Sequence, residues 1–298
     1  MKTFTFIISI VILIFFSTLL LSCSKDDDEI DFPELTGTYL GQTLPSIIPE
    51  IFAPGIISST ENIEASCTFF PDDNEFYFSR TNGLQPGGNT YIMVTKYKNG
   101  KWTKPETASF SGSYNDFEPH VTPDGSRMFL SRHNSTDPSF NNGLWIMERS
   151  NNEWLNPEYF RFGMFISATN EGTIYYGNLA SQRTEDILRS EYIYGDYGEP
   201  LGVGLIESPY LDAHPCVAPD ESYLIFDSNR NNPSGPLDLF VSFKQLDGSW
   251  GTPIYFGGLL GNGAKMCATL SPDGKYLFYY SNNDLYWVNS EVFIELNK

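Results

Sequence analysis

The 298-residue chain has few of the side chains on which enzyme chemistry and nucleic-acid binding usually depend. It contains three histidines and four cysteines, and its 18 lysines and arginines face 37 aspartates and glutamates. The formal net charge is −19. This balance argues against a nucleic-acid partner and against electrostatic attachment to an anionic membrane surface, because both require positive charge on the protein.

Paired cysteines and catalytic motifs are missing as well. Three cysteines, Cys67, Cys216 and Cys267, lie beyond residue 23, and three cannot all pair, so no disulfide framework is expected. We expect them to be small buried apolar groups. No Gly-x-Ser-x-Gly elbow, phosphate-binding loop or Cys-x-x-Cys pair occurs. We therefore assign no catalytic residue.

The one long apolar run lies at the amino end. It extends from Phe4 to Leu21 without a charge and follows Lys2, which is typical of a secretory signal. The run closes on LLLSCS, which resembles the lipobox of bacterial lipoproteins. That resemblance implies a signal peptide over residues 1–22 and acylation of Cys23, for example by palmitate, with the lipid anchoring the chain to a membrane. The alternative is an uncleaved membrane anchor, since eighteen apolar residues are just long enough to span a bilayer.

An acidic segment, SKDDDEIDF, follows Cys23. Such a segment stays solvated and predicts an acidic, flexible tether over residues 23–43. It is also similar to the export signal of lipoproteins of the Bacteroidota. The similarity implies a lipid-anchored protein of the outer membrane that faces the cell surface, and a periplasm-facing orientation remains open.

The rest of the chain, residues 44–298, is built from a repeat. Four segments share a Pro-Asp turn followed by an aromatic strand, and a worn copy, TNEGTIYYGN (169–178), lies between the second and the last two. The four are FPDDNEFYFSR (70–80), TPDGSRMFLSR (122–132), APDESYLIFDSNR (218–230) and SPDGKYLFYYSNN (271–283). The turn positions Pro71, Pro123, Asn170, Pro219 and Pro272 are 52, 47, 49 and 53 residues apart. Each unit reads as four short strands without helical periodicity, which is typical of a β-propeller blade.

The spacing favours five blades. The fifth copy lacks the outer strand that the others end on, and PSIIPEIFAPGIIS (45–58), before the first copy, is similar to that strand. We therefore expect the N-terminal segment to supply the outer strand of the last blade and to close the ring. Six blades remain an alternative if this segment builds more than one strand.

The segment SPDGKYLFYYS (271–281) resembles the WD40-like β-propeller repeat (PD40) found in TolB. The resemblance covers about residues 60–290 and departs in the third copy, which has no proline. It implies an all-β propeller that works as an interaction module, with a protein or glycan partner held at the mouth of the central channel.

The innermost strand of each blade lines the channel, and its residues seven, five and three positions before the turn share one face. In the second copy these are Asp116, Glu118 and His120, and in the fourth they are Asp212, His214 and Cys216. The fifth copy places Lys265, Cys267 and Thr269 on the same face. We predict ligand-binding residues in the channel at Asp116, Glu118, His120, Asp212 and His214.

Three interpretations of this face stay open. It is a solvated channel wall, or a divalent-metal site at His120 and His214 with one or two of the carboxylates, or a carboxylate pair that acts on a glycan. No cofactor is assigned. The arginines at 80, 132 and 230 recur in the repeat, so we expect them to bond neighbouring carbonyls or carboxylates. The favoured function is a non-enzymatic binding or scaffold module. The alternative is a polysaccharide-active hydrolase or lyase with a metal or carboxylate site at the channel mouth.

Overall fold

The structure is a computed structural model that describes residues 32–85, 87–179, 186–204 and 210–297. The predicted signal peptide (residues 1–22) and the predicted acylation site Cys23 lie outside these residues. Within the described ranges, no helix combines the length and the apolar character that crossing a membrane would require.

Residues from Glu34 onward form one unit whose sheets follow one another along the chain. The first sheet contains β2 (Ile63–Phe69), β3 (Glu75–Thr81), β4 (Thr90–Lys98) and β5 (Lys101–Trp102), and β6 (Glu106–Thr107) also pairs with β4. The second contains β7 (Asn115–Val121), β8 (Arg127–His133), β9 (Gly143–Ser150) and β10 (Glu153–Trp154), and β11 (Glu158–Arg161) also pairs with β9. The third contains β12 (Met164–Ala168), β13 (Ile174–Gly177), β14 (Ile187–Ser190) and β17 (Leu201–Gly202).

The remaining two sheets complete the ring. The fourth contains β18 (Asp212–Val217), β19 (Tyr223–Ser228), β20 (Asp238–Phe243) and β21 (Ile254–Tyr255). The fifth contains β22 (Met266–Leu270), β23 (Tyr276–Ser281), β24 (Asp284–Asn289) and β1 (Glu50–Ile51). The other elements are the hairpin β15 (Tyr192–Ile193) and β16 (Asp196–Tyr197), the 3₁₀ turns η1 (Tyr39–Gly41), η2 (Gly257–Leu260) and η3 (Glu295–Asn297), and α1 (Glu291–Ile294).

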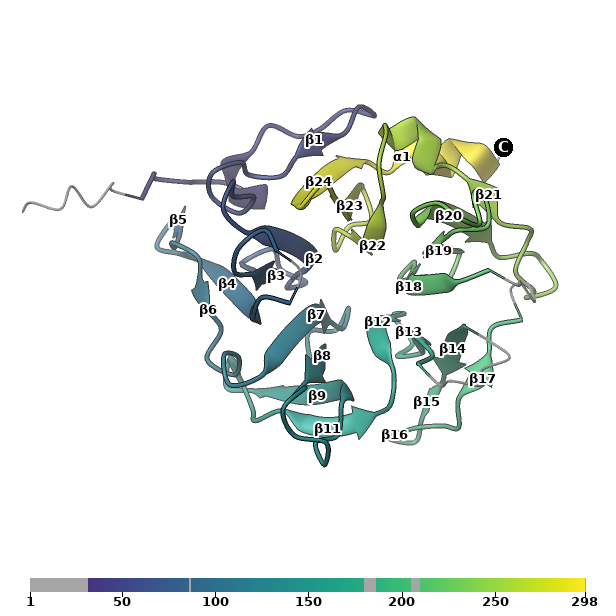
Figure 1. Cartoon of the computed structure of the whole chain (residues 1–298), viewed down its shortest axis with the longest axis horizontal. Coiled ribbons are helices and arrows are strands. Elements are labelled where there is room, and N and C mark those ends of the chain that lie inside the picture. Colours follow the sequence, from purple (N-terminus) through teal and green to yellow (C-terminus); the bar gives the residue numbers. More distant parts are fainter. Residues whose placement is uncertain (1–31, 86, 180–185, 205–209, 298) are drawn as a thin grey trace, which may run out of the picture. The chain divides into compact units, whose positions relative to one another are not determined.

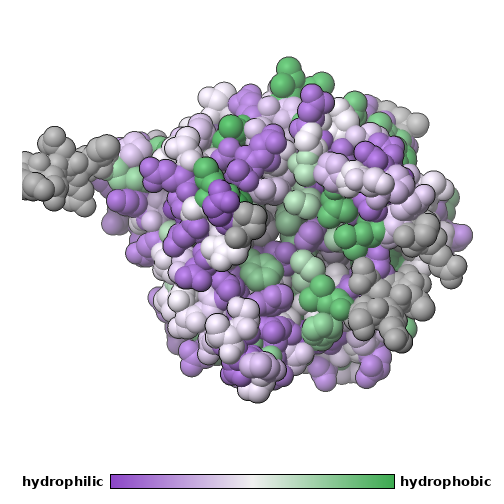
Figure 2. Space-filling model, viewed as in Figure 1, coloured by the Kyte–Doolittle hydropathy of each residue, from purple (hydrophilic) through white to green (hydrophobic). Residues whose placement is uncertain are grey.

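The five sheets of four or five strands in the described chain are the blades of a β-propeller. Their first strands, β2, β7, β12, β18 and β22, surround a common centre (Figure 1). A space-filling view of the same face shows a hollow near that centre, bordered by both hydrophilic and hydrophobic residues (Figure 2). The prediction of an all-β propeller with five blades is confirmed.

The N-terminal segment closes the ring, as the sequence predicts. Strand β1 pairs antiparallel with β24 through Glu50 opposite Trp287 and Ile51 opposite Tyr286, and the two strands lie side by side in Figure 1. The Phe52 N–H donates to the carbonyl oxygen of Leu285 at 2.8 Å. This pairing covers a sheet edge that would otherwise expose a row of unpaired backbone groups.

Packing also extends into the segment that the sequence assigns to the tether, residues 23–43. Tyr39 and Leu40 are 5% and 0% exposed, and the Tyr39 ring lies edge-on to Phe69 at 5.2 Å. The indole N–H of Trp102 donates to the carbonyl oxygen of Gly37 at 2.8 Å. The Tyr39 ring also lies edge-on to Tyr276 at 5.2 Å, so this part of the segment packs against the first and last blades.

Each repeat turn places its third residue in the left-handed region of backbone space. The φ angles are 68° at Gly125 and 70° at Gly274, which favours glycine because it has no Cβ. The carboxylate of Asp124 accepts from the Thr122 hydroxyl and from the Ser126 N–H, which fixes the turn. These turns set the start of the second strand of each blade and thereby the end of the channel strand.

Candidate functional site

A β-bulge interrupts each of the five described channel strands. The pairing register between first and second strands shifts between Glu64 and Cys67, Phe117 and His120, Met164 and Ile166, Ala213 and Cys216, and Met266 and Thr269. Four bulge residues, each five positions before its turn, have positive φ: 58° at Glu118, 43° at Phe165, 47° at His214 and 55° at Cys267. Residues other than glycine rarely adopt this conformation. Bulges re-aim side chains, and here they divide the predicted polar face into three layers.

The first layer, seven positions before the turn, is held by arginines. The Arg132 guanidinium donates to Asp116 at 2.6 Å and to the carbonyl oxygen of Phe110 at 2.7 Å. Arg230 donates to Asp212 in the fourth blade. Burial raises the pKa of Asp212, while Ser228 and Arg230 oppose that rise.

The same arrangement recurs in the first blade, where Arg80 donates to Glu64 at 2.7 Å and to the carbonyl oxygen of Ile57 at 2.8 Å. The prediction that these arginines bond carboxylates or carbonyls is confirmed. The carboxylates of the first layer are therefore committed to ion pairs inside their own blades.

The second layer, at the bulges, brings three chemically different groups together. The His214 Nε2 lies 3.6 Å from Glu118 Oε1. One carboxylate oxygen of Glu118, one ring nitrogen of His214 and the Cys267 Sγ all lie within 4.8 Å of one another. The other ring nitrogen, Nδ1, lies 2.8 and 2.9 Å from the two carboxylate oxygens of Asp227. Phe165 packs edge-on against the imidazole at 5.1 Å. This central cluster, Glu118, His214, Cys267 and Asp227, draws on the second, fourth and fifth blades.

Hydrogen bonds between neighbouring blades fix the backbone of this layer. The Glu118 N–H donates to the Ser79 hydroxyl of the first blade at 2.9 Å. The Phe165 N–H donates to Glu118 Oε2 at 2.9 Å, and the Cys267 N–H donates to Asp227 Oδ1 at 3.2 Å. Each bulge named here is thus tied to a side chain of the preceding blade, so the layer is rigidly placed at the axis.

Burial and mutual contact shift every pKa in the central cluster. Burial raises the pKa of Glu118 and of Asp227, and the neighbouring His214 opposes both rises. Burial acts to lower the pKa of His214, but Asp227 and Cys267 together outweigh it and hold that pKa well above its ordinary value. Burial also raises the pKa of the Cys267 thiol; His214 opposes this rise, while Glu118 and Asp227 add to it. The cluster is therefore an electronegative site around one imidazole.

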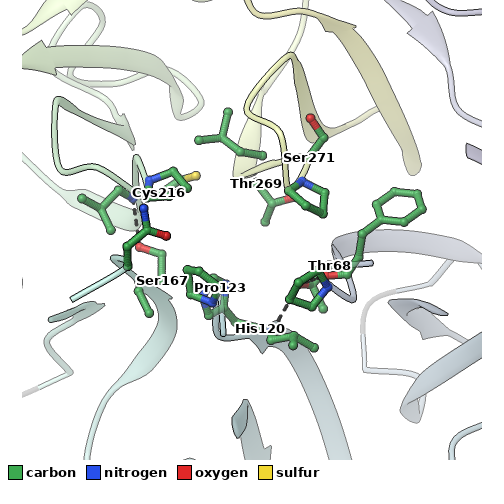
Figure 3. A pocket seen from close by; sticks show the side chains of 16 residues that line it. Thr68, His120, Pro123, Ser167, Cys216, Thr269 and Ser271 are labelled. Atoms are coloured by element: carbon green, nitrogen blue, oxygen red, sulfur yellow. Dashed lines mark hydrogen bonds between the residues drawn. The ribbon is translucent and has the colours of Figure 1, made fainter. Parts of the chain in front are cut away.

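The third layer, three positions before the turn, lines a cavity of about 190 Å³ at the turn end of the channel (Figure 3). Its lining includes one residue of this layer from each blade: Thr68, His120, Ser167, Cys216 and Thr269. The turn residues Pro71, Pro123, Asn170, Pro219 and Pro272 complete it. No lining residue carries a carboxylate, an ammonium or a guanidinium, so the cavity suits an uncharged group.

Two of the cavity hydroxyls also hold neighbouring blades together. The Val121 N–H donates to the Thr68 Oγ1 at 3.2 Å, and the Val217 N–H donates to the Ser167 Oγ at 3.0 Å. His120 is different, because its buried Nε2 has no hydrogen-bond partner within the described ranges. Burial lowers the pKa of His120 to about 4, so its imidazole is neutral at neutral pH.

The five predicted site residues therefore fall into three places. Asp116 and Asp212 form ion pairs with arginines, Glu118 and His214 meet in the central cluster, and His120 lines the cavity. Within the described part of the chain, the one group of three potential metal ligands combines Glu118 and His214 with Cys267 rather than with His120.

Sequence reasoning assigned no role to two residues of the cluster. Cys267 stood on the predicted channel face and was treated as an apolar group; all three described cysteines are buried and free, as expected. Asp227 lies eight residues after its turn proline, where the first two copies have Ser79 and Ser131. The available signal is an acidic residue at a position that is serine in the first two copies and uncharged in all four other copies.

Comparisons with known proteins give the fold and no family. No family model and no curated protein matches the chain. Among solved structures, a protein from Agrobacterium tumefaciens described as a TolB has a TM-score of 0.51 at 12% identity, over 78% of each chain. A protein of unknown function from Dyadobacter fermentans has a TM-score of 0.50 at 14% identity, over 83% of each chain.

A gluconolactonase from Xanthomonas campestris has a TM-score of 0.49 at 11% identity, over 86% of this chain and 99% of its own. At such identities a likeness speaks for the fold alone, because propellers carry many unrelated functions. The chain is a β-propeller whose structural neighbours include a TolB-like one.

Proposed function

We propose that this propeller is a binding module that holds an uncharged polar group, presented by a protein partner or a glycan, in the cavity at the turn end of its channel. We further propose that acylation of Cys23 anchors it to the outer membrane, with the propeller facing the cell surface. The observation that carries the proposal is the composition of the cavity. All five blades contribute to it, and they contribute hydroxyls, an amide, an imidazole and apolar surface, without a charge.

The pairing and the position of the channel carboxylates favour binding over glycan hydrolysis. A glycosidase needs two carboxyl groups that flank the substrate, one of them free to hold a proton. Asp116 and Asp212 are held by Arg132 and Arg230, and the cavity itself contains no carboxylate. His120 supplies the one imidazole of the lining, and an imidazole both donates and accepts hydrogen bonds when it is neutral.

The test compares two histidines of the second blade. We predict that His120→Ala weakens ligand binding about tenfold, since a hydrogen bond lost from a closed cavity is worth about 1.4 kcal/mol. His133→Ala is the matched control. His133 also has a buried Nε2 without a hydrogen-bond partner in the described chain, and burial lowers its pKa too, but it lies outside the cavity.

To test for a glycan ligand, the full-length chain in detergent is screened against neutral glycans. To test for a protein partner, a photo-crosslinking residue is placed at the exposed rim position 170 and activated in cells. The exposed turn position 151 carries the same residue as a control. A glycan or a crosslinked protein that depends on His120 and not on His133 supports the proposal and identifies the source. Ligands that survive His120→Ala, or that are lost equally with His133→Ala, overturn it.

A further inference from the structure

We propose that Glu118, His214 and Cys267 bind a divalent cation of the zinc class at the propeller axis, with Asp227 positioning the imidazole. The site lies at the bulge layer of the channel strands, and none of its four residues lines the cavity proposed for ligand binding. It does not depend on the proposed function.

The spacing of the three ligand atoms is close to that of a metal site. Glu118 Oε1 and His214 Nε2 are 3.6 Å apart, and all three ligand atoms lie within 4.8 Å of one another. In a tetrahedral site with zinc bonds of about 2.0–2.3 Å, neighbouring ligand atoms lie roughly 3.3–3.6 Å apart. The widest separation has to shorten by up to about 1.2–1.5 Å to reach that geometry, a movement that two side chains can share.

Asp227 bonds one ring nitrogen of His214 and leaves the other, Nε2, available as a metal ligand. Its two carboxylate oxygens lie within 2.9 Å of His214 Nδ1, so Nδ1 carries the proton that they accept. In neutral imidazole the lone pair is then on Nε2, the nitrogen that faces Glu118. A carboxylate on the far nitrogen of a histidine ligand is the usual outer support of a zinc site.

Only one carboxylate oxygen of Glu118 is available as a metal ligand. Its Oε2 accepts from the Ser131 hydroxyl at 2.6 Å and from the Phe165 N–H at 2.9 Å. Its Oε1 points to the histidine. Hydrogen bonds therefore orient the carboxylate while one oxygen stays available as a ligand.

The charge around Cys267 favours a cation over a nucleophilic thiolate. Reactive cysteines lie in electropositive surroundings, whereas the imidazole beside this thiol is itself bonded to the Asp227 carboxylate and lies 3.6 Å from Glu118. A divalent cation supplies the positive charge that such a set lacks, and it ligates the thiol as thiolate. Sulfur with nitrogen and oxygen selects zinc over magnesium or calcium, which take oxygen ligands.

Three protein ligands leave one coordination position. Glu118, His214 and Cys267 are 7%, 9% and 9% exposed, so the site is buried near the propeller axis. A water molecule or a donor group of a bound molecule fills that position, as in zinc sites that keep an open coordination site.

The competing arrangement is a metal-free cluster in which a protonated His214 bridges Asp227 and Glu118. The full-length protein, stripped of metal by a chelator, is titrated with Zn²⁺ and separately with Co²⁺. We expect one equivalent of either ion, and with cobalt a near-ultraviolet thiolate charge-transfer band. We also expect zinc to slow alkylation of Cys267 at least tenfold, with the rates at Cys67 and Cys216 unchanged.

Variants then assign the ligands. Cys267→Ser abolishes the cobalt band, and Asp227→Asn weakens zinc affinity about 10- to 100-fold through the imidazole. Cys67→Ser, at a buried free cysteine outside both the cluster and the cavity, keeps wild-type affinity. The wild-type measurements decide the case even if Cys267→Ser fails to fold. Absence of stoichiometric zinc, a cobalt complex without the thiolate band, or alkylation of Cys267 that zinc does not slow overturns the proposal.

Discussion

Asp73 occupies a position in the first repeat turn that favours glycine, and replacing it should stabilise the protein. Its φ is 59°, close to the 68° of Gly125 and the 70° of Gly274 at the equivalent positions. Its carboxylate is poorly placed as well. Burial, with contributions from Asp273 and Asp72, raises the pKa of Asp73 to about 6, and its Oδ1 is buried without a hydrogen-bond partner among the described residues.

Two terms set the size of the effect of Asp73→Gly. Relief of the left-handed backbone contributes about 1–2 kcal/mol, from which the larger chain entropy of glycine removes about 0.5–1 kcal/mol. A pKa that rises from 3.8 to about 6 costs up to about 3 kcal/mol at neutral pH, and solvent screening of this partly exposed group reduces it to roughly 1–1.5 kcal/mol. The expected gain is about 2 kcal/mol, or roughly 4–8 °C in Tm for a domain of this size.

The electrostatic part has a defined pH dependence. Between pH 3.8 and about 6 the folded state holds a proton on Asp73 that the unfolded state has lost. The cost of this carboxylate is therefore full above pH 6, falls as the pH is lowered through that range, and is absent below pH 3.8. Asp73→Asn, which removes the charge and tolerates positive φ, should stabilise at pH 7.5 and have little effect near pH 4. Urea unfolding at both pH values measures this.

Glu221 provides the matched control, because it has the same backbone conformation and a satisfied carboxylate. Its φ is 60°, and its carboxylate bonds the Tyr175 hydroxyl and the Lys244 ammonium, the latter at 3.0 Å. Glu221→Gly relieves strain and loses both partners, so no net gain is expected. If Asp73→Gly and Glu221→Gly change stability equally, or if the effect of Asp73→Asn is independent of pH, the reasoning fails.

Two further substitutions test the ring and its ion pairs. Phe52→Ala should destabilise by about 3–5 kcal/mol, because Phe52 is fully buried and packs against Phe278 and Trp287 of the last blade; a loss below 1 kcal/mol in urea unfolding would mean that the N-terminal segment does not hold the ring closed. Arg132→Ala should cost about 3–5 kcal/mol by leaving the fully buried Asp116 without its partner. Restoring stability with Asp116→Asn in the same chain would support that cause, and a double variant no better than the single one would contradict it.

The fold was predictable because each copy of the repeat has the same sequence of a tight turn and an aromatic strand. A tight turn whose third residue has positive φ fixes where one strand ends and the next begins, and the aromatic strand that follows packs between sheets. The fifth copy lacks an outer strand, and residues 45–58 form an extra strand-like segment. The sequence alone was enough to match the two. The structure agrees with that match, since β1 pairs with β24 through Glu50 opposite Trp287.

The site was less predictable because strand alternation does not survive a bulge. Residues 116, 118 and 120 were expected on one face, yet the extra residue at the bulge separates an ion pair, an axial cluster and a cavity wall. Positive φ at a glutamate, a histidine and a cysteine has no signature in composition or periodicity. The channel residues that meet at the axis come from different strands, and their contacts depend on how all five strands are placed. The residue pattern of a single strand does not contain this placement.

One substitution within the repeat explains why the central cluster forms around the histidine of the fourth blade. In the first and second blades the residue eight positions after the turn is serine, and its hydroxyl bonds the bulge N–H of the next blade. In the fourth blade that position is Asp227, which bonds the Cys267 N–H and also His214 of its own blade. A serine would serve the backbone bond alone. The carboxylate adds an orienting partner for one imidazole, and it is this second bond that directs the free nitrogen toward Glu118 at the axis.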